Sequence, residues 1–245
     1  MQTGDPLDAS SVAAAIAPVI DRLRMAVVRA IRPAQAEIAE RTGVPEAVLG
    51  PIGNLRNLMP DRSAAVDDVL ALFVYQPAER IRAALDGLRA AGMLEGGDDV
   101  RLGGPGQLVV SELFARTQTF LDEAWWEHAD LIASLLPIAQ RACAAVAETG
   151  GAATRVVAPP YEPPGASPAL LLAETLSPLR FHRHDAHTWA WQAEGLTAEQ
   201  IQQLEPGPQR QRIEAETNRR AAAPYAVLTG AERFRLCTGL GALPN

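Results

Sequence analysis

The stretch from Ser63 to Leu108 constrains the fold more than any other part of the sequence. Apolar residues recur at helical spacing from Val66 to Phe73, and Gln76-Pro77 interrupts the pattern. Proline suits the first turn of a helix because the N–H groups of that turn have no intrahelical acceptor, so the missing N–H of proline costs no hydrogen bond. A second helix is therefore predicted from about Ala78 to Leu94, with a buried stripe formed by Ile81, Ala84, Leu85 and Leu88.

A short β-hairpin is predicted directly after this second helix. The segment from Glu95 to Gly106 is rich in Gly and Asp, and it offers two short strands around a tight turn. Val100 and Leu102 alternate with polar residues, so both are expected to face inward. The order helix, turn, helix, hairpin predicts a winged helix-turn-helix module at residues 63–108, within a larger protein that is mainly α-helical.

The run RIRAALDGLRAAGMLEGGDDVRLGGPGQ, from Arg80 to Gln107, resembles the recognition helix and wing of the MarR-like winged-helix regulators. Those proteins have an LxxxGLL helix end before a wing that closes with LTxxG. Here Leu102-Gly103 stands where Leu-Thr is found, so the threonine is missing. The resemblance implies a DNA-binding homodimer, in which helices outside the winged module form the dimer and border a ligand pocket.

Charge argues for and against a role in DNA binding. The chain has a net charge of −7, and between residues 64 and 107 four arginines against seven carboxylates leave a local charge of −3. Phosphate contacts normally require a basic surface. The candidate DNA-binding residues are Arg80, Arg82, Arg89 and Arg101. Asp98 and Asp99 in the wing oppose this role, so a winged module kept for packing or dimerisation is the alternative.

Residues 1–62 are expected to supply N-terminal helices. Residues 1–10 are polar and expected to be loose, and an amphipathic helix is predicted from Ser11 to Ile31, ended by Pro33. The next segment, around Gly43 and Pro45, indicates a helical hairpin that packs against the core or, alternatively, a second DNA-binding helix-turn-helix. A loop is predicted over residues 54–62.

Residues 109–149 are predicted to form long helices, with a kink or break at Pro137. The MarR-like resemblance implies that these helices border a dimer interface or pocket. Trp125 and His128 are candidate ligand-binding residues in this part. The alternative is a buried Trp125 beside an exposed Trp126.

Residues 150–167 are rich in Gly, Pro and Ser, which indicates a linker, with a short edge strand expected over residues 155–157. This segment is expected to separate the winged part from a C-terminal helical domain, residues 168–245. The alternative is that it wraps around a single core.

The densest polar cluster lies on a helix predicted to start at Ser177-Pro178 and to end at Gly195. Three of the four histidines in the chain lie on this helix, within a span of six residues. The ligand-binding candidates are His184, His187 and Trp191, and the catalytic candidates are His187, Asp185 and Arg183. Intramolecular salt bridges and an interface are the alternative explanation. Because Asp185 projects from another side of the helix than His184 and His187, no metal site is assigned.

The same helix carries a second resemblance. The phrases LRFHRHDAH, from Leu179, and IEAETNRRAAAPY, from Ile213, resemble the C-terminal half of a little-characterised group of actinobacterial helix-turn-helix proteins. Arg183, Asp185 and His187 match that group's Arg-x-Asp-x-His pattern. Asn218 departs from it, since an acidic residue is usual there. The resemblance draws attention to these positions but implies no chemistry.

The last part of the chain carries clear local signals. Thr197 and Gln200 form a capping box, a charged helix is predicted from Gln209 to Ala222, and a final helix from Ala231 to Leu240 is expected to pack through Phe234 and Leu236.

Several protein classes are disfavoured because their motifs are missing from the sequence. We find no phosphate loop, dinucleotide fingerprint, nucleophile elbow or zinc-finger spacing, and no cofactor is assigned. The N-terminus lacks a signal peptide and no apolar run was expected to reach membrane-spanning length, so no membrane partner and a cytoplasmic location are expected. Cys143 and Cys237 are interpreted as small buried hydrophobes. Two hypotheses remain: a ligand-responsive, dimeric DNA-binding regulator, or an enzyme or small-molecule-binding protein that uses the winged module as a scaffold.

Overall fold

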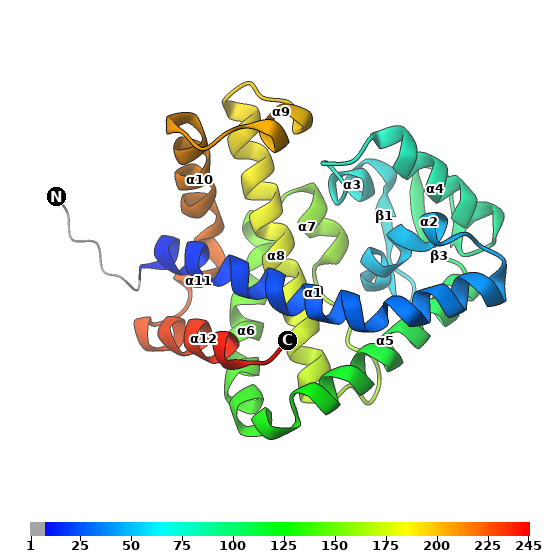
Figure 1. Cartoon of the computed structure of the whole chain (residues 1–245), viewed down its shortest axis with the longest axis horizontal. Helices are drawn as coiled ribbons and strands as arrows, with labels where there is room; N and C mark the ends of the chain where they lie inside the picture. Colours follow the sequence, from blue (N-terminus) through cyan, green and yellow to red (C-terminus); the bar gives the residue numbers. More distant parts are fainter. Residues whose placement is uncertain (1–7) are drawn as a thin grey trace.

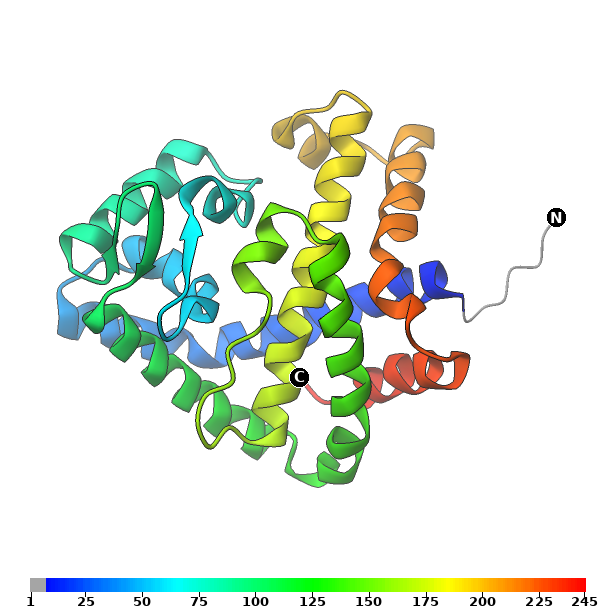
Figure 2. The same cartoon turned by 180° about the vertical axis from the view of Figure 1, so that it is seen from behind.

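The computed structural model describes residues 8–245, a mainly helical chain with a small three-stranded antiparallel sheet (Figures 1 and 2). The first helix, α1 (Ala9–Thr42), crosses the molecule from the C-terminal helices at one end to the sheet at the other. At 1.5 Å per residue it is about 50 Å long. It packs against α5, α8, α10, α11 and α12, so it ties the two ends of the chain's fold together.

The expectation that Pro33 ends α1 is wrong. The helix starts where the Asp8 carboxylate accepts hydrogen bonds from the backbone N–H groups of Ser10 and Ser11, and it ends at Gly43, which has a φ of +69°. An interior proline costs about 3 kcal/mol. The buried face continues beyond Pro33 through Ala34 and Ile38, and burial of these side chains offsets that cost. Of the residues expected to be loose, 1–7 lie outside the described part.

The segment after α1 is compact. It contains a four-residue helix and two 3₁₀ turns: α2 (Glu46–Leu49), η1 (Gly50–Asn54) and η2 (Arg56–Leu58). Leu49, Ile52, Leu55 and Leu58 are buried. The helical hairpin predicted around Gly43 is therefore formed by the end of α1 and by α2. Residues 54 and 56–58 of the predicted loop lie in 3₁₀ helices.

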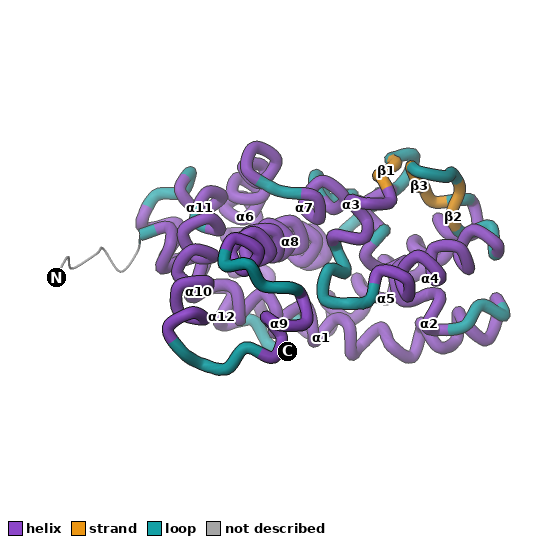
Figure 3. Tube along the Cα trace, turned by 90° about the horizontal axis from the view of Figure 1, so that it is seen from above, coloured by secondary structure: helices purple, strands orange, loops and turns teal. Residues whose placement is uncertain are grey.

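The central segment forms a unit that we call the helix–sheet unit, residues 63–102. Its elements are β1 (Ser63–Ala65), α3 (Val66–Ala71), α4 (Ala78–Ala90), β2 (Leu94–Glu95) and β3 (Asp99–Leu102). The sheet order is β1-β3-β2, with Ala64 opposite Val100 and Leu94 opposite Leu102 (Figure 3). The inward placement of Val100 and Leu102 is confirmed. The sequence did not indicate β1, and α4 ends four residues before the expected boundary at Leu94.

Two long helices follow, but they do not divide at Pro137. The chain forms α5 (Gly104–Ala124), η3 (Trp126–His128) and α6 (Ala129–Thr149), and Pro137 lies inside α6. Within residues 8–245, the span Trp126–Thr149 is the one helical stretch that is long and apolar enough to cross a membrane, contrary to expectation. In this structure α6 packs against α8, α11 and α12.

The proline-rich segment 150–167 contains a helix instead of the expected edge strand. This helix, α7 (Ala152–Val157), buries Ala153, Thr154, Val156 and Val157 against α8 and α3. These contacts place the segment against the core, which corresponds to the alternative in which it wraps around one body.

Helix α8 (Pro168–Ala193) is central to the C-terminal part and packs against α6, α7 and α10. Ser167 caps its first turn by accepting a hydrogen bond from the Leu170 N–H. The predicted start at Ser177-Pro178 is wrong, because Pro178 is buried inside the helix. The predicted end is confirmed, since Gly195 adopts a φ of +74° just after it.

Four further helices complete the fold: α9 (Ala198–Gln203), α10 (Pro208–Ala221), α11 (Ala223–Ala226) and α12 (Gly230–Ala242). The capping box of Thr197 and Gln200 is confirmed. Leu236 is buried as expected, whereas Phe234 is 57% exposed, which contradicts its predicted packing role. Cys143 is buried and Cys237 is partly buried, both as free thiols.

Candidate functional site

The four arginines predicted to contact DNA lie on the outer surface of the helix–sheet unit. Arg80 and Arg82 are exposed on the first two turns of α4, whose opposite face is buried against α2 and α3. Arg82 lies 3.3 Å from a carboxylate oxygen of Asp67, and Arg101 lies 2.8 Å from Glu95. Arg89 donates to the hairpin-turn carbonyls of Gly96 and Gly97, so it holds the hairpin against α4.

A groove of about 530 Å³ runs between α4 and the hairpin. Its charged lining residues are Arg82, Arg89, Asp67, Asp86, Asp98 and Asp99. Carboxylates outnumber arginines in this groove, as they do in the sequence of the whole unit.

His128 does not line the cavity of the described structure that Trp125 lines. The Trp125 side chain is 2% exposed, and its indole Nε1–H donates to the Pro244 carbonyl at 3.1 Å. Its neighbour Trp126 is 71% exposed. The structure therefore corresponds to the alternative of a buried tryptophan beside an exposed one, although Trp125 does line a small cavity near α1.

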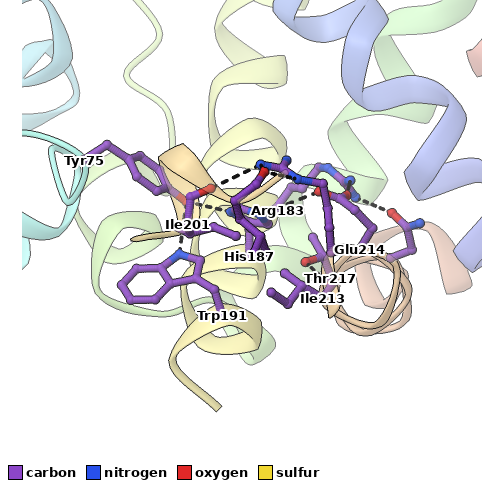
Figure 4. Close-up of polar contacts among 11 residues, drawn as sticks. Tyr75, Arg183, His187, Trp191, Ile201, Ile213, Glu214 and Thr217 are labelled. Atoms are coloured by element: carbon purple, nitrogen blue, oxygen red, sulfur yellow. Dashed lines mark hydrogen bonds and ion pairs between the residues drawn. The ribbon is translucent and has the colours of Figure 1, made fainter. Parts of the chain in front are cut away.

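The histidine-rich part of α8 faces the turn between α3 and α4. Nε2 of His184 lies 2.8 Å from the carbonyl oxygen of Ala71, so that nitrogen carries a proton and donates it. Nδ1 of His187 lies 2.6 Å from the Tyr75 hydroxyl, and Nε1–H of Trp191 donates to the same hydroxyl at 3.3 Å (Figure 4). His184, His187 and Trp191 therefore join the C-terminal helices to the helix–sheet unit.

Glu214 on α10 extends this contact into a chain of polar groups. Its Oε1 lies 3.6 Å from His187 Nε2, and its Oε2 accepts a hydrogen bond from Arg183 (Figure 4). A proton on Nε2 lies on the side of the Glu214 carboxylate, which favours this tautomer electrostatically and leaves Nδ1 to accept the Tyr75 O–H. We assign this tautomer, which gives an ordered chain of Glu214, His187, Tyr75 and Trp191.

A cavity of about 170 Å³ lies beside this chain, between α1, α8 and α10. We call it the junction pocket, and its polar lining residues are Asp21, Tyr75, Arg180, Arg183, His184 and His187. Most of these side chains already bond to each other or to neighbouring groups. Burial lowers the pKa of His184 and of His187 and raises that of Tyr75, so all three are neutral at pH 7.

Asp185 lies apart from the junction pocket and has a structural role. Its carboxylate accepts hydrogen bonds from the backbone N–H groups of Gly151, Ala153 and Thr154, at 2.9 to 3.1 Å, and from the Thr154 hydroxyl at 2.6 Å. It thus caps the N-terminus of α7 from another helix. Asp185, one of the catalytic candidates, therefore bonds to the start of α7, and the carboxylate that lies beside His187 is that of Glu214.

Sequence reasoning missed a group of residues around α1. Arg24, Arg56, Glu174 and Arg180 line a cavity of about 300 Å³ between α1, η1, α5 and α8. They come from positions far apart in the chain, and no local pattern signals that they meet. Within residues 8–245, no group of three or more His, Cys, Asp or Glu side chains could hold a metal ion.

No protein-family model matches the sequence, and neither the curated proteins nor the solved structures contain a match to it. The function is therefore argued from the geometry of these sites.

The buried histidines make stability depend on pH. Burial lowers the pKa of His182, His184 and His187, whereas unfolded histidines titrate near pH 6.5. As the pH falls from 7 to 5, the unfolded chain binds protons that the folded chain does not, so the free energy of unfolding must fall. Each histidine contributes at most about 1.4 kcal/mol per pH unit.

Urea unfolding between pH 7 and 5 measures how steeply the free energy of unfolding changes with pH. We expect His184→Gln to reduce this slope, because Gln keeps a donor for Ala71 but does not titrate. His128→Gln, outside this segment, is the control. An unchanged slope in His184→Gln contradicts the assignment.

Proposed function

We propose that this protein is a ligand-responsive DNA-binding regulator of the cytoplasm that acts as a homodimer. In this proposal the helix–sheet unit is a winged helix-turn-helix, α4 enters the major groove, and the hairpin is the wing. The observation that carries the proposal is the exposed outer face of α4, which presents Arg80 and Arg82 and is covered by no other part of residues 8–245.

The order of elements supports this function. Strand β1 pairs with β3 beside two helices joined by a short turn, and the hairpin follows α4. A recognition helix contacts bases through residues near its N-terminus, and Arg80 and Arg82 occupy the first two turns of α4.

The charges of the helix–sheet unit determine how tightly it is expected to bind DNA. The ion pairs of Arg82 with Asp67 and of Arg101 with Glu95 are exposed, with side chains 50–88% accessible. Exposed pairs stabilise a protein by about 0–1 kcal/mol, so phosphates can displace these carboxylates at little cost. Asp98 and Asp99 would still repel the DNA backbone, and we therefore expect modest affinity that depends steeply on salt.

The contacts of Tyr75 provide a route for ligand response. Tyr75 lies in the turn between α3 and α4, bonds to His187, and lines the junction pocket. Its carbonyl also accepts a hydrogen bond from Gln202 of the helical part. A ligand that shifted α8 would therefore act directly on the turn that positions α4.

Substitutions on α4 and in the hairpin should change DNA affinity in opposite directions. We expect Arg80→Ala/Arg82→Ala to weaken binding by roughly 10- to 100-fold, since one specific base contact contributes about 1–3 kcal/mol. We expect Asp98→Asn/Asp99→Asn to strengthen binding, because it removes two charges that face phosphate.

Fluorescence anisotropy with a duplex from the region upstream of its own gene, at 50 to 200 mM salt, measures both effects. Arg219→Ala, an exposed arginine on α10 that pairs with Glu216, is the matched control. Absence of binding by the unsubstituted protein at 50 mM salt rejects the proposal. Light scattering tests the proposed dimer.

The chain of Glu214, His187 and Tyr75 supports a second candidate, an enzyme or small-molecule-binding protein that works at the junction pocket. A neutral histidine held between a carboxylate and a tyrosine hydroxyl can move a proton. A compound that raises the melting temperature of the unsubstituted protein should not do so for His187→Gln. An equal shift in both proteins removes this candidate.

A further inference from the structure

The cavity missed by sequence reasoning has an unbalanced charge. We call it the arginine cavity, and its charged lining residues are Arg24, Arg56, Arg180 and Glu174. Glu174 is the one acidic residue among the residues that line it, and its Oε2 is paired with Arg56 Nε at 2.6 Å. Arg180 pairs with Asp21 at 2.7 Å, outside the cavity.

Arg24 is the lining arginine that forms no ion pair within residues 8–245, although the Glu174 carboxylate lies near enough to attract its charge. It projects from α1 into the cavity and makes no hydrogen bond or ion pair with any residue in the described range 8–245. Burial and the nearby Arg56 lower the pKa of Arg24 to about 9, so the group stays charged at pH 7. Arg24 is half-buried, and its guanidinium lies near those of Arg56 and Arg180 without a protein acceptor. A bound anion would supply the missing hydrogen-bond acceptors and offset this repulsion.

The lining of the arginine cavity also includes apolar side chains. Val28 and Ile31 of α1 and Leu113 and Phe114 of α5 line it, together with Thr117 of α5. Its volume of about 300 Å³ is at the lower end of the range for small-molecule sites. A ligand that fits must therefore combine one anionic group with a small apolar body.

We infer that the arginine cavity binds a small organic oxyanion, a carboxylate or a phosphate on an apolar body, with Arg24 as its anchor. The planar guanidinium of arginine matches the two oxygens of either group. Val28, Ile31 and Phe114 remove the apolar body from water. Such a ligand would be an effector of the proposed regulator, but the inference requires no DNA binding and stands if the regulator is rejected.

The ligand also has a structural route to the rest of the molecule. Arg180 lines both the arginine cavity and the junction pocket, and it sits one turn before His184 on α8. Occupancy of the arginine cavity therefore acts on the helix that bonds to Tyr75.

Isothermal titration calorimetry with six-carbon probes tests the inference. Hexanoate and hexyl phosphate carry the two oxyanions, and hexanol and hexylammonium are the neutral and cationic probes of matched length. We expect at least one anion to bind at least tenfold more tightly than hexanol, and hexylammonium not to bind. The stronger of the two anions identifies the oxyanion that the site prefers.

Arg24→Met is expected to reduce the affinity for the preferred anion at least tenfold. Arg29→Met, on the exposed side of the same helix, should bind it like the unsubstituted protein. Arg24→Met should also raise the melting temperature of the ligand-free protein, because it replaces an unpaired charge by an apolar side chain, and this second readout shows that the variant is folded. Binding of hexanol as tightly as the anions, unchanged binding in Arg24→Met, or no binding of either anion at millimolar concentration overturns the inference.

Discussion

Replacing Glu174 by Gln is expected to lower the free energy of unfolding by about 3–5 kcal/mol. The side chains of Glu174 and Arg56 are 5% and 10% exposed, and their charged atoms lie 2.6 Å apart. Removing the carboxylate leaves Arg56 charged and buried, beside Arg24 and Arg180. No other acidic side chain lines the arginine cavity to replace it.

Urea unfolding at pH 7 measures this loss, with Glu112→Gln as the matched control. Glu112 pairs with Arg41 at 2.6 Å, but those side chains are 25% and 60% exposed, so its loss should cost about 0–1 kcal/mol. The double variant Arg56→Met/Glu174→Leu should recover most of the stability, because it removes both charges together. Equal unfolding midpoints for Glu174→Gln and Glu112→Gln contradict the account.

Replacing Asp185 by Ala is expected to lower the free energy of unfolding by about 3 kcal/mol. Hydrogen bonds to a charged group contribute about 1.5–3 kcal/mol each, but the partly exposed N–H groups can bond to water instead, which reduces the total loss. The carboxylate accepts four hydrogen bonds at the start of α7. Asp185→Asn, which keeps one acceptor oxygen, should lose less. The effect should appear locally as faster hydrogen exchange at residues 151–157.

Urea unfolding and hydrogen exchange together measure this change. Asp130→Ala, an exposed acidic residue in the first turn of α6, should change stability by no more than about 0.5 kcal/mol. If Asp185→Ala is as stable as Asp130→Ala and α7 keeps its protection from hydrogen exchange, the capping role is wrong. Asp185 would then again be a candidate catalytic residue.

The site shows why part of it was predictable. Three histidines within six positions are visible in the sequence, and the structure places His184 and His187 together at one junction. Their partners, Ala71 and Tyr75, lie more than a hundred positions away in the sequence. Local sequence patterns therefore could not predict that this segment connects α8 to the helix–sheet unit. Asp185 was a catalytic candidate because it lies in the histidine-rich segment, yet its contacts are with the start of α7.

Local chemistry in the sequence by itself determined α4, the hairpin and the capping box at Thr197, because each depends on residues a few positions apart. The tertiary structure decided where helices pass through proline: Pro33, Pro137 and Pro178 all lie inside helices. Burial of long apolar faces outweighs the loss of one hydrogen bond, and that burial exists only after distant segments meet. The arginine cavity has the same origin, since charges from α1, η2 and α8 become neighbours only when the chain has folded.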